Sequence, residues 1–592
     1  MTGLELDEPM ADPARLAAEL DEWLGDPTDV GNAFSWKASA VWDRAEAFPG
    51  PAVSELDVWG LSRHYVPARH GGALRRLDTL LSLLRTVARR DLTVAVAHAK
   101  TFLGSVCVWA AGSDDQCAKL AARIVNGEPV AWALTERDHG SDLGADEFEA
   151  VPDAEGNLRL SGEKWPINNA SRADLVVVLA RTAGRPGARA LSLVLLDKEQ
   201  AGPGTVQNLR KALTHGIRGA DISGIVCIDA RVPADALVGR PGTGLETVLR
   251  VLPLTRTVCT ALSLGAADHA LELATGFAEE RKLYGRRVIE LGRPAQLLAE
   301  SYATLFAVEA VTWVVGRAAQ SLTAEMPVLS AVAKAFVPNA VDDLIAACAE
   351  VLGARGFLDE TYEDGRFAKL DRDHRIVSIF DGNTYVNRNA LIQHFPVLAR
   401  RWQERRFDTA GLAATVDPAV RMPDLDFTAL CLFSEMGCSP VQSLESMLPR
   451  VLSRLASLPC GSTIRALVGH FCDGLEVLHS EMATVRGTAG RDVPAEAFDL
   501  AERYEWAFAA AAAVHLWLAV DDEDPAHSAL ARDGLWLEAV LRIALPRLCP
   551  ALVLAEQETE LLRVVRTLRG AGMRPSLYGL LVPAAARRDG TR

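Results

Sequence analysis

The sequence predicts a mostly helical α+β protein, and three observations support that fold class. Apolar residues recur at helical spacing over residues 12–130 and again after residue 244. Between these regions, over residues 131–237, the pattern changes to short runs rich in β-branched residues. The chain has 592 residues, which is long enough for several packed domains. We therefore expect an N-terminal helical domain, a middle β domain and further helical domains after it.

The first two domains are predicted from periodicity and from breaks in it. The N-terminal helical domain, residues 1–130, has its clearest helical stretch at 80–87, and breaks are expected where prolines and a glycine pair interrupt the pattern. The middle domain, residues 131–240, is predicted to be β-barrel-like, because each of its apolar runs is bounded by Gly, Pro or Asp. Those runs lie at 175–179, 191–196 and 224–228.

After the turn at 241–244, long Ala- and Leu-rich patterns predict a four-helix-bundle domain over residues 241–403. The four patterns cover residues 246–278, 294–320, 327–352 and 384–400. A stretch rich in Gly, Pro and Asp follows, and residues 404–425 are interpreted as a linker. Residues 426–592 are expected to form an additional C-terminal helical domain, in which we recognise no chemical motif.

Composition narrows the classes of ligand. There are 62 Lys and Arg against 77 Asp and Glu, a net charge of −15. This balance argues against a nucleic-acid surface and supplies no polybasic patch for anionic lipid. A small organic ligand fits better.

Cysteines and apolar runs indicate the compartment. The ten cysteines are scattered singly, without a C-x-x-C pair or a spacing typical of metal ligands, so we expect buried thiols and no metal site. The N-terminus is acidic and does not resemble a secretion signal. The longest apolar run, residues 506–520, is shorter than the ~20 residues of a spanning helix. We expect a cytoplasmic protein without a membrane span.

Seven motifs stand in order between about residue 55 and residue 400. They are Val66-Pro67-Ala-Arg-His-Gly71-Gly72, Asp91-Leu-Thr-Val-Ala-Val-Ala-His98, Thr135-Glu136-Arg137-Asp138-His139-Gly140-Ser141-Asp142, Trp165-Pro-Ile-Asn168-Asn169-Ala, Arg281-Lys-Leu-Tyr284-Gly285, Val351-Leu352-Gly353-Ala354-Arg355-Gly356-Phe357 and Ile379-Phe-Asp381-Gly382-Asn383-Thr384. In this order and spacing they resemble the acyl-CoA dehydrogenase family. Length and helicity after residue 425 resemble its longer members, which carry an extra C-terminal helical domain.

The resemblance implies an FAD-dependent flavoprotein that removes a proton from the α carbon of an acyl thioester and transfers a hydride from the β carbon to flavin N5. Most family members place a Glu before the last bundle helix as the base, and Asp381 stands there, one methylene shorter. Some carry the base on an earlier helix, at the position of Thr255, which has no carboxylate. Arg256 is expected close to the base. The competing interpretations are that Asp381 caps the helix beginning near Thr384 and that Arg256 is a solvated helix residue.

The resemblance also implies the residues that bind FAD. In the middle domain they are Trp132, Leu134, Thr135, Gly140, Ser141, Trp165 and Asn168. In the bundle they are Arg281, Tyr284, Gly353, Asn383 and Tyr385, of which Arg281 matches the arginine that reaches the FAD diphosphate of a neighbouring subunit. A homo-oligomer is therefore implied, and the extra domain favours a dimer.

The chain departs from the family pattern at several of these positions. Trp165 is displaced by one place, and Asn168 stands where the family has Thr, although its amide can still donate to a flavin. Glu350 and Ala354 replace the usual Gln and Gly.

These departures keep three functions open. The first is the dehydrogenase of an acyl group on CoA or on a carrier protein, for which the resemblance implies an electron-transfer flavoprotein as electron acceptor. The others are a flavin-dependent monooxygenase of the same fold, which needs no base, and a non-catalytic partner subunit.

Overall fold

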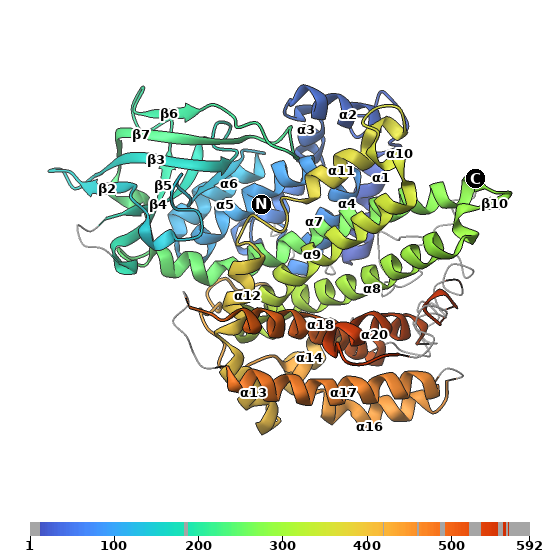
Figure 1. Cartoon of the computed structure of the whole chain (residues 1–592). Coiled ribbons are helices and arrows are strands. Elements are labelled where there is room, and N and C mark those ends of the chain that lie inside the picture. The colour runs from blue at the N-terminus through green and yellow to red at the C-terminus, as the bar shows by residue number, and fades with distance from the viewer. Residues whose placement is uncertain are drawn as a thin grey trace, which may run out of the picture.

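The computed structural model describes residues 12–182, 187–417, 419–458, 461–485, 492–519, 534–554, 560–563 and 566. The fold is mostly helical, with one large sheet in the middle domain (Figure 1). The predicted fold class is thus confirmed. Part of the predicted C-terminal domain, including everything after residue 566, lies outside the described residues.

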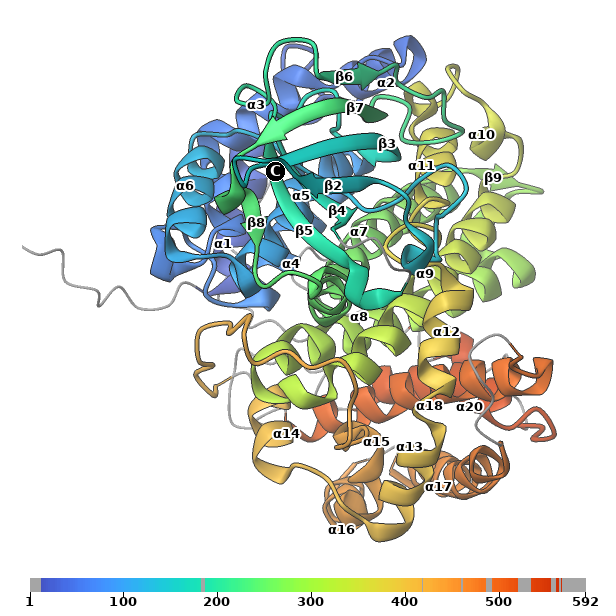
Figure 2. The ribbon, with the colours of Figure 1, turned by 90° about the vertical axis from the view of Figure 1, so that its left-hand side faces the viewer.

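From residue 12 on, the N-terminal region contains six α-helices: α1 (Pro13–Leu24), α2 (Trp36–Ala45), α3 (Gly50–Trp59), α4 (Leu77–Arg90), α5 (Leu92–Ala111) and α6 (Asp114–Val125). Helix α5 matters most for the site. Its N-terminus is capped by Asp91, whose side chain accepts a hydrogen bond from the Val94 N–H, and most of its residues are buried. It packs against both strand β1 and helix α7 and so lies between the sheet and the bundle (Figure 2).

The middle domain is an eight-stranded sheet of order β6-β7-β3-β2-β4-β5-β8, with β1 paired parallel to β4. Its strands are β1 (Val130–Ala133), β2 (Glu149–Pro152), β3 (Leu158–Asn168), β4 (Leu175–Arg181), β5 (Leu191–Asp197), β6 (Val206–Leu209), β7 (Ile222–Val232) and β8 (Leu237–Val238). The register of β3 against β7 shifts between Lys164 and Ile167. Pro166 has no N–H for the ladder, so Trp165 and Pro166 leave the regular pairing near the end of β3. This end lies next to α5, because the Asn169 side chain donates to the Ala97 carbonyl at 2.7 Å.

Three long helices form the body of the bundle: α7 (Gly244–Glu280), α8 (Gly292–Ser321) and α9 (Met326–Leu352). Between α7 and α8 the short strands β9 (Lys282–Leu283) and β10 (Arg286–Arg287) make a projecting hairpin (Figure 1). After α9 come α10 (Ala354–Phe357) and α11 (Arg366–His374).

The fourth bundle helix, predicted as one pattern over 384–400, is two helices. They are α12 (Thr384–Ile392) and α13 (Phe395–Glu404). Pro396 explains the break, because its ring excludes the carbonyl of Ile392 and its nitrogen cannot donate to it. The prediction of a single helix was wrong at this point.

The remaining described helices are α14 (Thr409–Val416), α15 (Ser439–Gln442), α16 (Leu444–Leu455), α17 (Gly461–Thr484), α18 (Ala495–Ala519) and α20 (Leu535–Leu548). Helices α18 and α20 lie against α8, and α17 lies against α13 (Figure 1). One hydrophobic core runs from the N-terminal helices through the bundle into this extension, and the sheet has a second core of its own.

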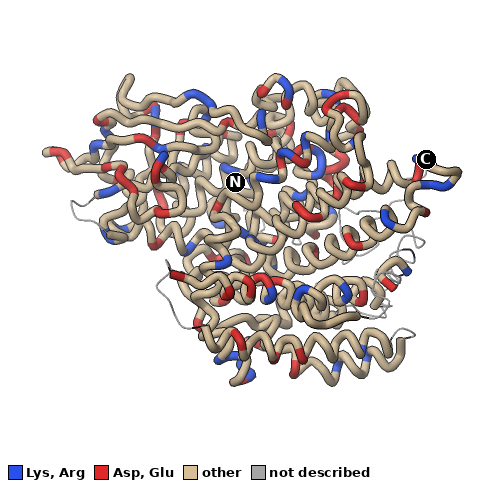
Figure 3. The backbone as a smooth tube through the Cα atoms, viewed as in Figure 1, with Lys and Arg blue, Asp and Glu red and all other residues tan. Residues whose placement is uncertain are grey.

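Three described helices, α5, α7 and α8, are long and apolar enough to cross a membrane by length and composition. The expectation that no stretch reaches that length was therefore wrong. In each, 83% of the most apolar window is buried inside the protein, so packing within the fold accounts for its hydropathy. Acidic and basic residues are interspersed over most of the visible chain (Figure 3).

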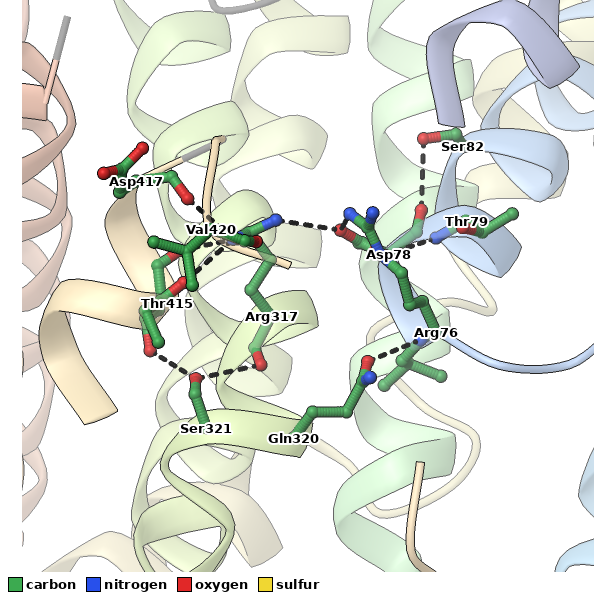
Figure 4. Close-up of polar contacts among 12 residues, drawn as sticks. Arg76, Asp78, Thr79, Ser82, Arg317, Gln320, Ser321, Thr415, Asp417 and Val420 are labelled. Atoms are coloured by element: carbon green, nitrogen blue, oxygen red, sulfur yellow. Dashed lines mark hydrogen bonds and ion pairs between the residues drawn. The ribbon is translucent and has the colours of Figure 1, made fainter. Parts of the chain in front are cut away.

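A buried arginine ties the linker to the bundle. Arg317, on α8, is 1% exposed, and its guanidinium donates to carbonyl oxygens at and beyond the C-terminus of α14 (Figure 4). The acceptors are the carbonyls of Ala414, Thr415, Asp417 and Val420, at 2.7–3.3 Å. Arg317 Nη1 also lies 3.6 Å from Asp78 Oδ2 on α4. One side chain therefore donates to carbonyls at and just beyond the end of α14 and links three elements.

Glu325, directly before α9, makes a second connection, between the bundle and Ser439 at the start of α15. Its Oε2 accepts a hydrogen bond from the Ser439 N–H at 2.7 Å, and the Ser439 hydroxyl donates to Oε1. Burial raises the pKa of Glu325 to about 7, although the bonds from Ser439 oppose that shift.

This raised pKa predicts a pH-dependent stability. The folded protein holds the Glu325 proton more tightly than the unfolded chain, so the stabilisation is complete below about pH 4.5 and is lost as pH rises through about 7. Glu325→Gln, which keeps an acceptor for Ser439 and does not titrate, should remove this component. We expect the wild-type melting temperature to fall between about pH 5 and about pH 8 relative to that of the variant. Differential scanning fluorimetry checks this, with the exposed Glu404→Gln as control, and parallel profiles for wild type and Glu325→Gln would contradict it.

Candidate active site

Asp381 lies in the turn between α11 and α12. It has φ 56° and the next residue, Gly382, has φ 89°, so both adopt the left-handed conformation that Asp tolerates and Gly favours. The cap of α12 is Asn383, whose side chain accepts from the Val386 N–H at 2.9 Å. The alternative that Asp381 caps this helix was therefore wrong, and its carboxylate points elsewhere.

The Asp381 carboxylate is directed at α5 and α7. Its Oδ2 accepts a hydrogen bond from Lys100 Nζ at 2.8 Å and one from Cys259 Sγ at 3.6 Å. Both members of the ion pair are mostly buried, with side chains 10% exposed for Asp381 and 15% for Lys100. The second oxygen, Oδ1, makes no hydrogen bond to any residue that the structure describes. One carboxylate oxygen is thus held in place and the other remains available to a ligand.

Two further cations surround this turn. Arg256 is a buried residue of α7, and burial lowers its pKa to about 10 while the nearby Asp381 opposes that shift. It is not the solvated helix residue of the competing interpretation. Lys334, on α9, donates to the carbonyls of Val377 at 2.7 Å and Gly382 at 3.1 Å. Burial lowers the pKa of Lys334, and its bonds hold both ends of the turn that carries Asp381.

Cys259 is a neutral member of the cluster. Burial raises the pKa of its thiol to about 12, and the negative charge of Asp381 contributes in the same direction. The thiol therefore stays protonated and donates to the carboxylate. The nine described cysteines are free, while Cys460 lies outside the described residues.

Sequence reasoning missed Lys100, Cys259 and Lys334. Lys100 is a lone cation within the apolar stretch 92–111, and Lys334 one within 326–341. A charge at such a position is rarely buried without a partner, and that rule could have drawn attention to both lysines. The partner of Lys100, Asp381, cannot be deduced from sequence, because it lies 281 residues away. Lys334 donates to two backbone carbonyls of the same turn, which sequence does not reveal either.

The end of β3 forms a second part of the site. Both amide atoms of Asn168, Nδ2 and Oδ1, are buried without a hydrogen-bond partner among the described residues. Nearby, the Trp165 N–H donates to the Thr135 carbonyl and the Thr135 hydroxyl donates to the Pro166 carbonyl, both at 3.1 Å. An unpaired buried amide is costly unless a ligand completes it. One donor and one acceptor together suit the edge of a flavin ring, so this part fits FAD.

The other predicted residues of the middle domain lie around this strand end. Trp132 and Leu134, on and just after β1, are half-buried, and the Trp165 ring lies under the Arg137 guanidinium at 4.6 Å. Gly140 and Ser141 are exposed in the following loop. Lys164 anchors this loop from beneath, because its buried ammonium contacts Glu136 at 3.1 Å and also Asp146.

The bundle residues expected at FAD do not all gather here. Arg281 directly precedes the projecting hairpin, Tyr284 lies in its turn and is 97% exposed, and Gly353 is exposed at the end of α9. Along the straight run of α7, Arg281 is about 37 Å from Arg256 at 1.5 Å per residue. Gly353 lies 19 residues beyond Lys334 along α9, which is about 28 Å at the same rise. Arg281, Tyr284 beyond it and Gly353 are therefore not brought to Asp381 within one chain.

Asn383 and Tyr385 have partners inside the chain. Asn383 is the α12 cap described above, and the Tyr385 ring stacks on Phe498 of α18 with centroids 4.9 Å apart. Both therefore hold α12 in place. No described group of three His, Cys, Asp or Glu side chains has an arrangement that could hold a metal ion.

Comparison of the sequence with models of known protein families gives matches to the N-terminal, middle and bundle domains. The family models for the acyl-CoA dehydrogenase N-terminal, middle and C-terminal domains match residues 36–128, 131–230 and 242–395. A probable acyl-CoA dehydrogenase, FadE25 of Mycobacterium tuberculosis, is 25% identical over 351 residues, which are 59% of this chain and 88% of the relative.

Solved structures show that the fold likeness reaches the extension. The acyl-CoA dehydrogenase of Bacillus anthracis complexed with FAD has a TM-score of 0.68 at 19% identity, covering 95% of this chain and 92% of that one. The prolyl acyl carrier protein oxidase AnaB has a TM-score of 0.58 at 19% identity, covering 64% and 97%. With all three domain models matched in order, the chain belongs to the acyl-CoA dehydrogenase family, whose members are FAD-dependent oxidoreductases that act on CH–CH bonds.

Proposed function

We propose that the protein catalyses FAD-dependent α,β-dehydrogenation of an acyl thioester, with Asp381 as the base for the α proton. The observation that carries this proposal is the Asp381 carboxylate, with Oδ2 held by Lys100 and Cys259 and Oδ1 without a partner among the described residues. General-base catalysis requires a carboxylate oxygen that is oriented but not occupied. The left-handed turn at 381–382, held by Lys334, fixes that orientation.

Each residue then has a defined part in the reaction. Asp381 takes the α proton at Oδ1, while the neutral Cys259 thiol keeps its hydrogen bond to Oδ2. FAD, held in part by Asn168, would supply a two-electron acceptor for the β hydrogen, so that the two hydrogens would leave as a proton and a hydride and an enoyl thioester would remain. Asn168 offers its unpaired amide to the flavin edge, and Thr135 and Trp165 hold that strand end in place.

Family membership supports the proposed acyl carrier and electron acceptor, and the compartment is proposed from the sequence alone. The substrate is an acyl-CoA or an acyl group on a carrier protein, and the fold likeness to a carrier-protein oxidase supports including the second. The electron acceptor is an electron-transfer flavoprotein, and the protein acts in the cytoplasm. Catalytic turnover with purified electron-transfer flavoprotein tests the acceptor, and cell fractionation tests the compartment.

A homodimer is proposed because Arg281, Tyr284 and Gly353 are exposed and too far from Asp381 to serve the same FAD-binding site within one chain. Helices α18 and α20 cover α8 and leave that face of the bundle unavailable to a second dimer. Light scattering in solution should give twice the mass of one chain. A monomer that retains FAD would contradict the proposal.

An anaerobic absorbance titration tests the function. We expect the visible flavin band of the purified protein to bleach when an accepted acyl thioester is added, without any reductase. A flavin that is reduced only by an added flavin reductase would instead indicate the monooxygenase, and a purified protein that binds no flavin would indicate the partner subunit. The retained carboxylate at 381 favours the dehydrogenase, because a monooxygenase needs no base there.

A further inference from the structure

Lys100 is a buried cation at the place where the acyl group reacts. It comes from α5, whose other residues from Leu92 to Ala111 carry no Asp, Glu, Lys or Arg. Its ammonium contacts Asp381 Oδ2 at 2.8 Å and lies 3.9 Å from the centre of the Phe380 ring. In the part of the chain that the structure describes, these are its only charged or aromatic partners.

The charges around Asp381 are unbalanced. Lys100, Arg256 and Lys334 face one carboxylate, and the thiol of Cys259 is neutral. Lys334 is satisfied by two backbone carbonyls, but Arg256 has a buried Nε without a hydrogen-bond partner. A buried cation without an anion is costly, so this cluster favours a further negative charge.

Proton transfer moves the negative charge away from Lys100. When Asp381 takes the α proton it becomes a neutral acid, and Lys100 then loses the charge of its only anionic partner. A neutral acyl chain cannot replace that charge, whereas an anionic group on the chain would pair with another N–H of the Lys100 ammonium, while Asp381 Oδ2 keeps its hydrogen bonds from Lys100 and Cys259.

We propose that the substrate is the monothioester of a dicarboxylic acid, whose free carboxylate, a few carbons from the thioester, binds Lys100. Lys100 is thus a specificity-determining residue that selects an anionic acyl group. This inference rests on the proposed dehydrogenation at Asp381 and adds the class of acyl chain.

The test compares glutaryl-CoA with valeryl-CoA, which has the same number of carbons but no second carboxylate. Binding to the FAD-loaded protein is measured by calorimetry, and kcat/KM by anaerobic flavin reduction. We expect the wild type to favour glutaryl-CoA by about tenfold or more in both, which is the range for a hydrogen bond to a charged group. Lys100→Met should lose this preference, Lys100→Arg should keep most of it, and Lys119→Met, an exposed lysine of α6, should behave as wild type.

The outcomes separate the two proposals. Reduction by valeryl-CoA with no preference for glutaryl-CoA, or a preference that survives in Lys100→Met, would overturn the inference and leave the dehydrogenase standing. If neither thioester reduces the flavin, the dehydrogenase proposal fails for these chains, and the calorimetric ratio still decides whether Lys100 selects an anionic acyl group. Because Lys100→Arg keeps the charge, it shows whether a loss in Lys100→Met comes from charge or from misfolding.

Discussion

Replacing Asp381 by Asn is expected to lower the rate of flavin reduction by an acyl thioester by about 10²–10⁴-fold, the usual contribution of a positioned general base. The amide has nearly the same shape and keeps an acceptor oxygen for Lys100 and Cys259, so the turn at 381–382 should be retained. It cannot accept the α proton, however. The loss should therefore appear in the chemical step, while flavin content and thioester binding stay close to those of the wild type.

Stopped-flow absorbance under anaerobic conditions measures this rate directly. Asp424→Asn is a matched control, because Asp424 also lies 2.8 Å from a basic side chain, that of Arg75, but in an exposed ion pair away from the site. Asp381→Glu should retain far more activity than Asp381→Asn, since the carboxylate is kept. A wild-type reduction rate in Asp381→Asn, with flavin bound, would exclude Asp381 as the base.

Much of the fold follows from local pattern, because periodicity and turn residues act over a few positions. The apolar runs at 175–179 and 191–196 predicted strands β4 and β5, and the Ala- and Leu-rich repeats predicted α7 to α9 with ends within a few residues. The single pattern at 384–400 failed although the signal was present. Pro396 by itself predicts a helix break, but the apolar periodicity continues on both sides of it and favoured a single helix.

The site was less accessible from sequence, because its chemistry depends on contacts between distant segments. Asp381 was found through its position in a motif, yet local sequence could not decide between a base and a cap, since Asp381 and Asn383 both precede α12. The geometry decides that Asn383 is the cap. Lys100 could not be assigned at all from sequence, because its function depends on α5 meeting the 381 turn in the folded protein. The same holds for Tyr385, whose ring meets Phe498 of the extension.

The second large effect is expected at the linker, where Arg317→Met should lower the free energy of unfolding by about 3–5 kcal/mol. Methionine fills much of the same volume but donates no hydrogen bond. The carbonyls of Ala414 and Thr415 at the end of α14 would be left buried without a donor, and Asp78 would lose one of its two arginine partners.

Chemical denaturation followed by circular dichroism measures the change, with Arg375→Met as control. Arg375 is 60% exposed and paired with Asp371 one helical turn away, an arrangement worth about 0.3–0.5 kcal/mol. The difference in stability between the two variants bears on function. Helix α14 begins the segment that leads into the extension. The extension in turn contacts α12 through Tyr385 and through the Arg388–Glu505 ion pair. If Arg317→Met were no more destabilising than Arg375→Met, the linker would be held mainly by its apolar contacts. A large loss of stability would show instead that one buried guanidinium maintains the connection between the bundle and the extension that supports the base-bearing turn.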